Sequence, residues 1–344
     1  MKVEVTMRRR SLRTLATKGR LALPVSTRPI VIGMALLIVI IVLAEFLVEG
    51  FLSSRNMRSI LLLAAFLGLA AIGQTFVALL GALDLSIPYL IGAANILLPS
   101  LMVSGWPAWA AMAFVIFLGF VAGMLNGLLS YRLQGQALIV SLGFGFAVVG
   151  ATQIYTSIGS KFGGTVFAQI PDWLRNLAAF NGETFGFAVP PVIVIWAFIS
   201  ALIIWIMART WFGRSVYAVG GSRVAAARLG ISEFRTWVGV HGISGAMAAL
   251  TGTLLLGFSG GGFVGVGDPY LFMTVAAVVI GGTSLLGGAG GYGATIIGVL
   301  VLTVLGALLV GVGLGPAGQQ AVIGVLILPM VAIYARAPHI RNQI

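Results

Sequence analysis

Residues 85–131 read LSIPYLIGAANILLPSLMVSGWPAWAAMAFVIFLGFVAGMLNGLLSY, and these 47 residues contain no Asp, Glu, Lys or Arg. A helix needs about 20 apolar residues to cross a bilayer, so the stretch is long enough for two crossings. The turn-forming residues 104–107, Ser-Gly-Trp-Pro, divide it into two halves of suitable length. This stretch therefore predicts a pair of membrane-spanning helices.

The rest of the chain has the same character. Of its 344 residues 59% are hydrophobic and 8% are charged, whereas soluble domains contain about 45–50% apolar and about 25% charged residues. A charge at the bilayer centre costs at least about 2.5–3.5 kcal/mol, so stretches without charge mark the spans. Counting them predicts an all-α polytopic membrane protein with about ten transmembrane helices in one domain, residues 30–335.

The basic residues predict the orientation. An even number of spans puts both termini on one side, and the positive-inside rule assigns the Lys- and Arg-rich side to the cytoplasm. Of the 20 Lys and Arg residues, only four then lie outside: Arg55, Arg58, Lys161 and Arg175. We expect cytoplasmic tails at residues 1–29, on anionic lipid headgroups, and at residues 336–344. Because topology explains the net charge of +12, no nucleic-acid partner is expected.

Two longer loops stand out. Residues 158–183 are predicted to lie on the periplasmic side, either as an ordinary connection or as a docking surface for a partner. Residues 209–235 are predicted to be cytoplasmic. There Ser222 is a suitable N-cap, residues 223–229 favour a helix and Gly230 suits its C-terminal end. So short a helix is unstable alone, so we expect it to rest on lipid or, as its small alanine face favours, in a cleft of another protein.

Asp84 is the only charged residue between residues 59 and 131. Gly81 before it and Pro88 after it predict an interrupted helix, and an acid beside irregular backbone must face protein or water. Asp84 and Ser86 therefore either line a pathway or cap free backbone N–H groups. The glycine-rich residues 281–291 occupy a comparable place in the second half, and paired interruptions are typical of a transporter's central site.

Other polar residues fall inside the predicted spans. Gln74, Asn95, Asn126 and Gln153 are expected to be buried, as hydrogen-bonding links between helices or as contacts with a solute. His241 begins the span after the basic loop and has no acid nearby in sequence. We therefore expect it at the membrane interface, although a membrane histidine can also relay protons.

Several kinds of chemistry have no residues to support them. The sequence has no cysteine and two histidines, so neither a thiolate nor a His-rich metal site is expected. It has no G-x-x-x-x-G-K-[ST] run, and no constellation for catalysis is recognisable. We predict a transport protein without enzymatic activity or a cofactor, powered by a separate subunit or an ion gradient. A non-transporting scaffold is disfavoured because it has no need for glycine-interrupted spans.

Residues 217–231, YAVGGSRVAAARLGI, resemble the coupling-loop signature of ribose-type permeases of ABC importers, Y-A-[IV]-G-G-N-x-x-A-A-R-L-S-G-I. Ser222 replaces the usual Asn, and Arg228 lies one position later. Three further stretches resemble elements of the same family in the same order: GQTFV and GALDLS in residues 73–86, NGLL and LIVSLG in residues 126–143, and IGGTSLLGG in residues 280–288.

The resemblance implies a bacterial inner-membrane importer of monosaccharides. Two permease copies would form the pathway, a periplasmic sugar-binding protein would deliver the solute, and a cytoplasmic ATPase, which binds ATP and Mg²⁺, would dock on the coupling loop. The coupling residues are then Gly220, Gly221, Ser222, Arg223, Ala225, Ala226, Arg228, Leu229 and Gly230. The pathway residues are Gln74, Thr75, Asp84, Ser86, Asn126, Thr283 and Ser284. Alternatives are an ion-gradient-driven transporter of a small polar solute and a permease for branched-chain amino acids or nucleosides.

Overall fold

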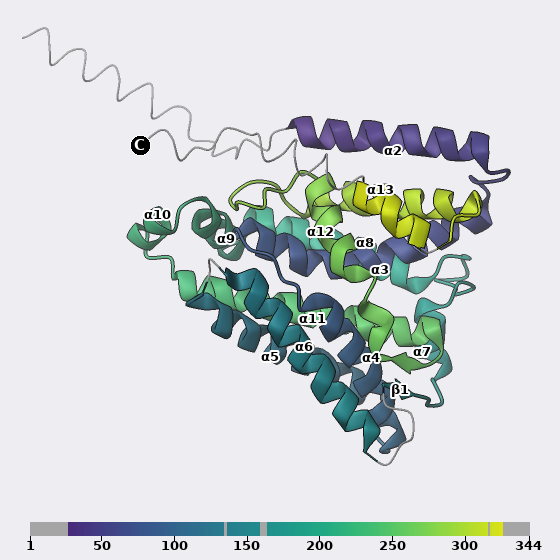
Figure 1. Ribbon diagram of the computed structural model, residues 1–344, viewed down its shortest axis with the longest axis horizontal. Helices are drawn as coiled ribbons and strands as arrows, with labels where there is room; N and C mark the ends of the chain where they lie inside the picture. Colours follow the sequence, from purple (N-terminus) through teal and green to yellow (C-terminus); the bar gives the residue numbers. More distant parts are fainter. Residues whose placement is uncertain (1–26, 134–135, 159–163, 316, 326–344) are drawn as a thin grey trace, which may run out of the picture.

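The computed structural model describes residues 27–133, 136–158, 164–315 and 317–325, and nearly all its regular structure is helical (Figure 1). The elements are α2 (Thr27–Leu47), α3 (Ser54–Leu79), α4 (Ile87–Val103), α5 (Ala108–Tyr131), α6 (Ala137–Ser157), β1 (Thr165–Val166), α7 (Asp172–Ala178), α8 (Pro191–Arg209), α9 (Trp211–Gly221), α10 (Arg223–Arg228), α11 (Glu233–Ser259), β2 (Gly262–Phe263), the 3₁₀ helix η2 (Val264–Gly267), α12 (Tyr270–Ile280) and α13 (Tyr292–Gly311).

Seven of the described helices are long and apolar enough to cross a membrane: α2, α3, α5, α6, α8, α11 and α13. The predicted all-α polytopic fold is therefore confirmed. The predicted third and eighth spans correspond to shorter apolar segments, α4 and residues 264–280. Most of the predicted tenth span lies outside the described residues, as do residues 1–26 and 336–344 of the two predicted tails. The helix α2 begins at Thr27 and so includes the last residues of the predicted N-terminal tail.

The helix α3 lies at the centre of the assembly. Of its apolar window 89% is buried, against 22% for the windows of α2, α5, α6 and α8. Small residues allow this, because helices in membranes associate by close packing of Gly, Ala and Ser. Gly68 lies under the indole of Trp196 from α8, and Gly73 lies against Ser244 from α11. The apolar faces of the outer helices are left for lipid.

The helices α5 and α11 cross with their backbones in contact. A Cβ atom added at Gly245 of α11 would overlap the carbonyl oxygen of Gly119, and one added at Gly123 would overlap the carbonyl oxygen of His241. Backbones approach this closely only where side chains are absent. This crossing holds α11 in register with α5.

We predict that Gly245→Val destabilises the protein, because overpacking a close contact costs about 1–3 kcal/mol or more. The control is Gly239→Val on the same helix, where an added Cβ has no neighbour within 4 Å. Thermal unfolding of the purified protein in detergent measures both. Equal melting temperatures for the two variants would contradict the packing described above.

Two helix interruptions meet at the C-terminal end of α3. The helix α4 begins only after a turn in which Gly81 has φ +79°, and α12 ends at a loop, residues 281–291, in which Gly282 has φ +80°. Both values lie in the left-handed region that glycine adopts without strain. The two interruptions are therefore encoded by glycine, as the sequence predicted.

The two longer loops lie at opposite ends of the assembly. The helix α7 precedes α8, whereas α9 and α10 follow its other end, and α8 is about 28 Å long at 1.5 Å per residue. Figure 1 shows α7 and β1 at one end and α9 and α10 at the other. At the α7 end, β1 pairs with β2 through Thr165 and Phe263, which joins the predicted periplasmic loop to the segment before α12.

Candidate functional site

Asp84 lies in the turn between α3 and α4, and 1% of its surface is exposed. Its Oδ1 atom accepts hydrogen bonds from the backbone N–H and the hydroxyl of Ser86, at 3.0 and 2.6 Å. The same atom accepts from Nδ2 of Asn126 on α5, at 3.1 Å. Its Oδ2 atom accepts from the Ser244 hydroxyl on α11, at 2.7 Å. We call these four residues the Asp84 cluster; it joins α4, α5 and α11 through one carboxylate.

The cluster includes a local cap but extends beyond it. Asp84 binds the N–H of Ser86, which is itself the N-cap residue of α4 and whose side chain makes no capping bond. A cap needs no donors from other helices, yet Asn126 and Ser244 supply two. The turn is also joined to α6, because the N–H of Leu85 donates to Ser141 Oγ at 3.0 Å. Sequence reasoning missed Ser141 and Ser244, since a serine in a span has no distinguishing pattern.

His241, which the sequence predicted at the membrane interface, is buried within the protein, with 1% of its surface exposed. It precedes Ser244 on α11 by about one turn and lies close enough to Asp84 to interact with it electrostatically. Its Nδ1 donates to the carbonyl oxygen of Trp237 at 2.9 Å. No sequence pattern indicated this proximity, because Asp84 lies in a turn far from His241 along the chain.

Asn95 and Gln153, two of the amide side chains predicted to be buried, have different environments. Asn95 links helices as predicted: Nδ2 donates to the carbonyl of Gly252 at 3.0 Å, and Oδ1 accepts from the N–H of Phe263 at 2.8 Å. Gln153 is exposed, so its predicted burial was wrong; it lies on the face of α6 that points away from the assembly.

Gln74 is fully buried, and neither polar atom of its amide has a hydrogen-bond partner among the described residues. Oδ1 of Asn126 is unpartnered in the same sense. A buried polar group without a partner costs about 1–3 kcal/mol. The protein therefore buries three amide atoms at a cost that none of the described residues offsets.

Three predicted hydroxyls serve other parts of the fold. Thr75 Oγ1 donates to the carbonyl of Ala71 at 2.6 Å and lies 3.0 Å from Thr295 Oγ1 on α13. Thr283 and Ser284 shape residues 281–291: their hydroxyls accept from the N–H groups of Gly291 (3.1 Å) and Leu286 (3.2 Å). Within the described ranges no hydrogen bond joins them or Gln74 to the Asp84 cluster. The structure thus brings together only Asp84, Ser86 and Asn126 of the predicted pathway set.

A backbone junction connects α9 to both helix interruptions. A Cβ atom at Gly220 would overlap the carbonyl oxygen of Leu79 at the end of α3, and the N–H of Gly288 donates to that same oxygen at 2.9 Å. Gly81 and Gly287 complete the contact, since each approaches the other's segment closely. We call Leu79, Gly81, Gly220, Gly287 and Gly288 the glycine joint. With no side chain between the three segments, movement of one displaces the others.

Tyr217 reinforces the glycine joint from α9. Its hydroxyl donates to the carbonyl of Gly290 at 2.8 Å. Burial raises the pKa of the Tyr217 hydroxyl above its ordinary value, so the group keeps its proton at neutral pH and remains a donor.

The helix α10 is exposed apart from one side chain. Ala226 is buried, while residues 221–225 and 227–230 are exposed, including 66% of Val224 and 75% of Leu229. Ser222 Oγ accepts from the N–H of Ala225 at 3.3 Å, and Gly230 has φ +74°. The predicted cap, helix and terminating glycine are confirmed, although the helix ends at Arg228. Of the predicted coupling residues, Gly220 belongs to the glycine joint, and the backbone of Gly221 packs against Gly288 beside it.

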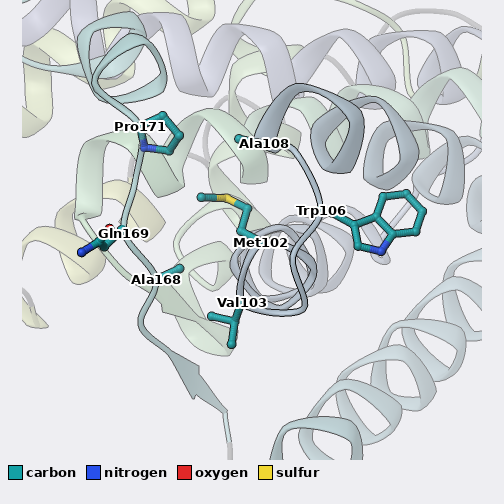
Figure 2. Close-up of a pocket in the computed structure, with 7 residues that line it drawn as sticks. All are labelled: Met102, Val103, Trp106, Ala108, Ala168, Gln169 and Pro171. Carbon is teal, nitrogen blue, oxygen red and sulfur yellow. The ribbon is translucent and has the colours of Figure 1, made fainter.

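Figure 2 shows a pocket at the opposite end of α4 from Asp84. Its volume is about 400 Å³, and it is lined mostly by apolar side chains: Met102, Val103, Trp106, Ala108, Ala168, Gln169 and Pro171. It lies where the α4–α5 turn meets residues 168–171 of the predicted periplasmic loop. None of the predicted site residues lines it.

We predict that Asp84→Ala lowers the melting temperature markedly, because it leaves buried donors of Ser86, Asn126 and Ser244 unpaired at about 1–3 kcal/mol each. The control is Asp172→Ala, which removes an exposed carboxylate whose only described ion pair is at 3.9 Å. Thermal unfolding in detergent is the measurement. A melting temperature for Asp84→Ala equal to that of Asp172→Ala would contradict a central role for the cluster.

Comparisons with known proteins match this chain to permeases of transport systems. A family model described as "Branched-chain amino acid transport system / permease component" matches residues 56–331. The chain is 32% identical to the ribose import permease protein RbsC of Bacillus subtilis (strain 168), over 86% of this chain and 90% of that one. It is 34% identical to the probable ABC transporter permease protein YphD of Escherichia coli (strain K12), over 87% and 88%. It is 30% identical to the fructose import permease protein FrcC of Rhizobium meliloti, over 82% and 78%. No solved structure is a significant match.

Proposed function

Because the chain belongs to the family of branched-chain amino acid transport system permease components, we propose that it is the membrane-spanning subunit of an ATP-driven importer for a monosaccharide. It is a multi-pass protein of the bacterial inner membrane. The similar proteins named as ribose and fructose import permeases favour a sugar as the solute. The observation that carries the proposal is the exposed helix α10, connected through α9 to both helix interruptions.

The cytoplasmic ATPase docks on α10. Val224 and Leu229 expose most of their apolar surface there, on a helix too short to be stable without neighbours. A protein cleft that takes both side chains removes this surface from water and holds the helix in place. ATP and Mg²⁺ bind to that ATPase, and this chain supplies no cofactor site.

The glycine joint transmits the motion. When the ATPase pair closes, α10 and α9 move together, and Gly220 displaces the end of α3 and residues 281–291 because no flexible side chain lies between them. Both displaced segments are helix interruptions, where rigid bodies turn against each other in transporters. The spans then alternate between outward-open and inward-open arrangements.

Solute passes along the predicted pathway residues with weak affinity. The unpartnered amide of Gln74 and the free Oδ1 of Asn126 supply polar atoms for a sugar hydroxyl or for water. A second copy of the chain completes the pathway, and a periplasmic sugar-binding protein delivers solute at the end that carries residues 158–183. This arrangement has about ten spans and both termini in the cytoplasm.

Gly221→Trp tests the docking surface. An added Cβ at Gly221 has no neighbour within 4 Å, so we expect the variant to fold while its indole blocks the ATPase. Uptake and the amount of co-purified ATPase should both fall, with the melting temperature unchanged. The matched variant Gly220→Ala should instead lower the melting temperature by disturbing the glycine joint. Wild-type uptake by Gly221→Trp would count against docking on α10.

Purification and transport assays test the function itself. Affinity purification of the full chain from its own cells should recover a P-loop ATPase, and membrane vesicles containing both should take up D-ribose or D-fructose when ATP is supplied. Uptake that an ionophore abolishes, by the chain without an ATPase, would support a gradient-driven transporter instead. Uptake of L-leucine or a nucleoside, with none of either sugar, would keep the importer but change its solute.

A further inference from the structure

Trp237 lies between α10 and the Asp84 cluster. It is one turn into α11 and fully buried. The guanidinium carbon of Arg223, the first residue of α10, lies 5.6 Å from the centre of its ring. Arg223 is held over the ring by Glu233, because Nε lies 3.2 Å from Oε1 of that carboxylate. One face of the indole therefore receives a cation from α10.

Trp237 also contacts the elements that bind Asp84. Its ring stacks on His241, with centroids 5.1 Å apart and planes at 30°. His241 is followed by Ser244, the donor to Asp84 Oδ2. Trp237, His241 and Ser244 are spaced four and three residues apart, so they share one face of α11.

The indole N–H reaches a second helix. Nε1 of Trp237 donates to Ser130 Oγ on α5, at 3.1 Å, and Ser130 follows Asn126, the other interhelical donor to Asp84, by one turn. The single indole is thus joined to both helices whose side chains hold the carboxylate. A rigid aromatic ring in a close-packed interior passes on a displacement instead of absorbing it.

We propose that Trp237 is the positioning residue through which α10 controls the Asp84 cluster. The proposal rests on the proposed function, in which an ATPase moves α10. Movement of Arg223 shifts the indole, and the indole shifts Ser244 along α11 and Asn126 along α5. The glycine joint reaches the turn that contains Asp84 through Gly81. Asp84 is then where two routes from α10 converge.

The first test measures coupling in vesicles that contain the full chain and its co-purified ATPase. In Trp237→Leu we expect wild-type recovery of the ATPase and continued ATP hydrolysis, while D-ribose imported per ATP hydrolysed falls roughly 2- to 30-fold, the usual span of such coupling effects. The matched control, Trp205→Leu, changes an indole that is 58% exposed on α8 and should leave the ratio unchanged. A wild-type ratio in Trp237→Leu would overturn the proposal.

A second measurement needs no transported solute. The chain has no cysteine, so Leu83→Cys places one thiol beside Asp84, and its rate of labelling by a maleimide reports movement of the turn. We expect ATP to change this rate in the otherwise wild-type complex, and to change it less in the Trp237→Leu background, where only the route through the glycine joint remains. An ATP response of wild-type size in that background would overturn the proposal.

Variants that keep an aromatic ring guard against misfolding. Both Trp237→Phe and Ser130→Ala remove the hydrogen bond from the indole to Ser130. Trp237→Phe preserves a ring stacked on His241, and Ser130→Ala preserves the whole indole. Their effects on the coupling ratio should be equal and should not add in the double variant, whereas additive effects would overturn the proposal. If the wild-type complex itself imports no sugar with ATP, the proposed function fails, independently of Trp237.

Discussion

A carboxylate buried among membrane helices must be surrounded by donors, and this constraint organises the centre of the protein. Asp84 lies where the chain stops being helical, and its two oxygens accept from α4, α5 and α11. Because a charge cannot face lipid tails, α4, α5 and α11 must keep their contacts with Asp84 when the turn that contains it moves. The same turn begins at Gly81, in contact with residues 281–291. The hydrogen bonds to Asp84 and the backbone contact at Gly81 therefore both hold the turn between α3 and α4 in place.

The interior combines closely packed helices with two interruptions of the helical backbone. Gly73, Gly119 and Gly245 let α3, α5 and α11 approach within backbone distance, and Gly68 makes room on α3 for the Trp196 indole of α8. The centre is therefore held by close packing and not by apolar transfer, since lipid is as apolar as the core. Gly81 and Gly282 have the opposite effect and lie in the turns where α3 and α12 end. Rigid bodies separated by short turns are what hinge and shear motions require.

The sequence predicted most of the fold because a charge in a bilayer is so costly that its absence marks a span. The α4–α5 division at residues 104–107 and the short helix after Ser222 were both read correctly. The predicted third and eighth spans are shorter helices than the length rule expects, with 17 residues in α4 and 11 in α12, because the rule assumes that every crossing is one continuous helix. Asp84, Ser86 and Asn126 were found by polarity alone. Ser244, His241 and Trp237 were not linked to them, because their contacts depend on how α11 crosses α5, and no local pattern encodes a crossing.

The exposed surface of α10 affects how readily the chain is degraded before it binds a partner. A two-turn segment with protruding aliphatic groups, unable to hold its shape alone, is the kind of exposed tip that proteases cut first. A subunit made in excess of its partner would therefore be cleared from the membrane, whereas one engaged early would be shielded.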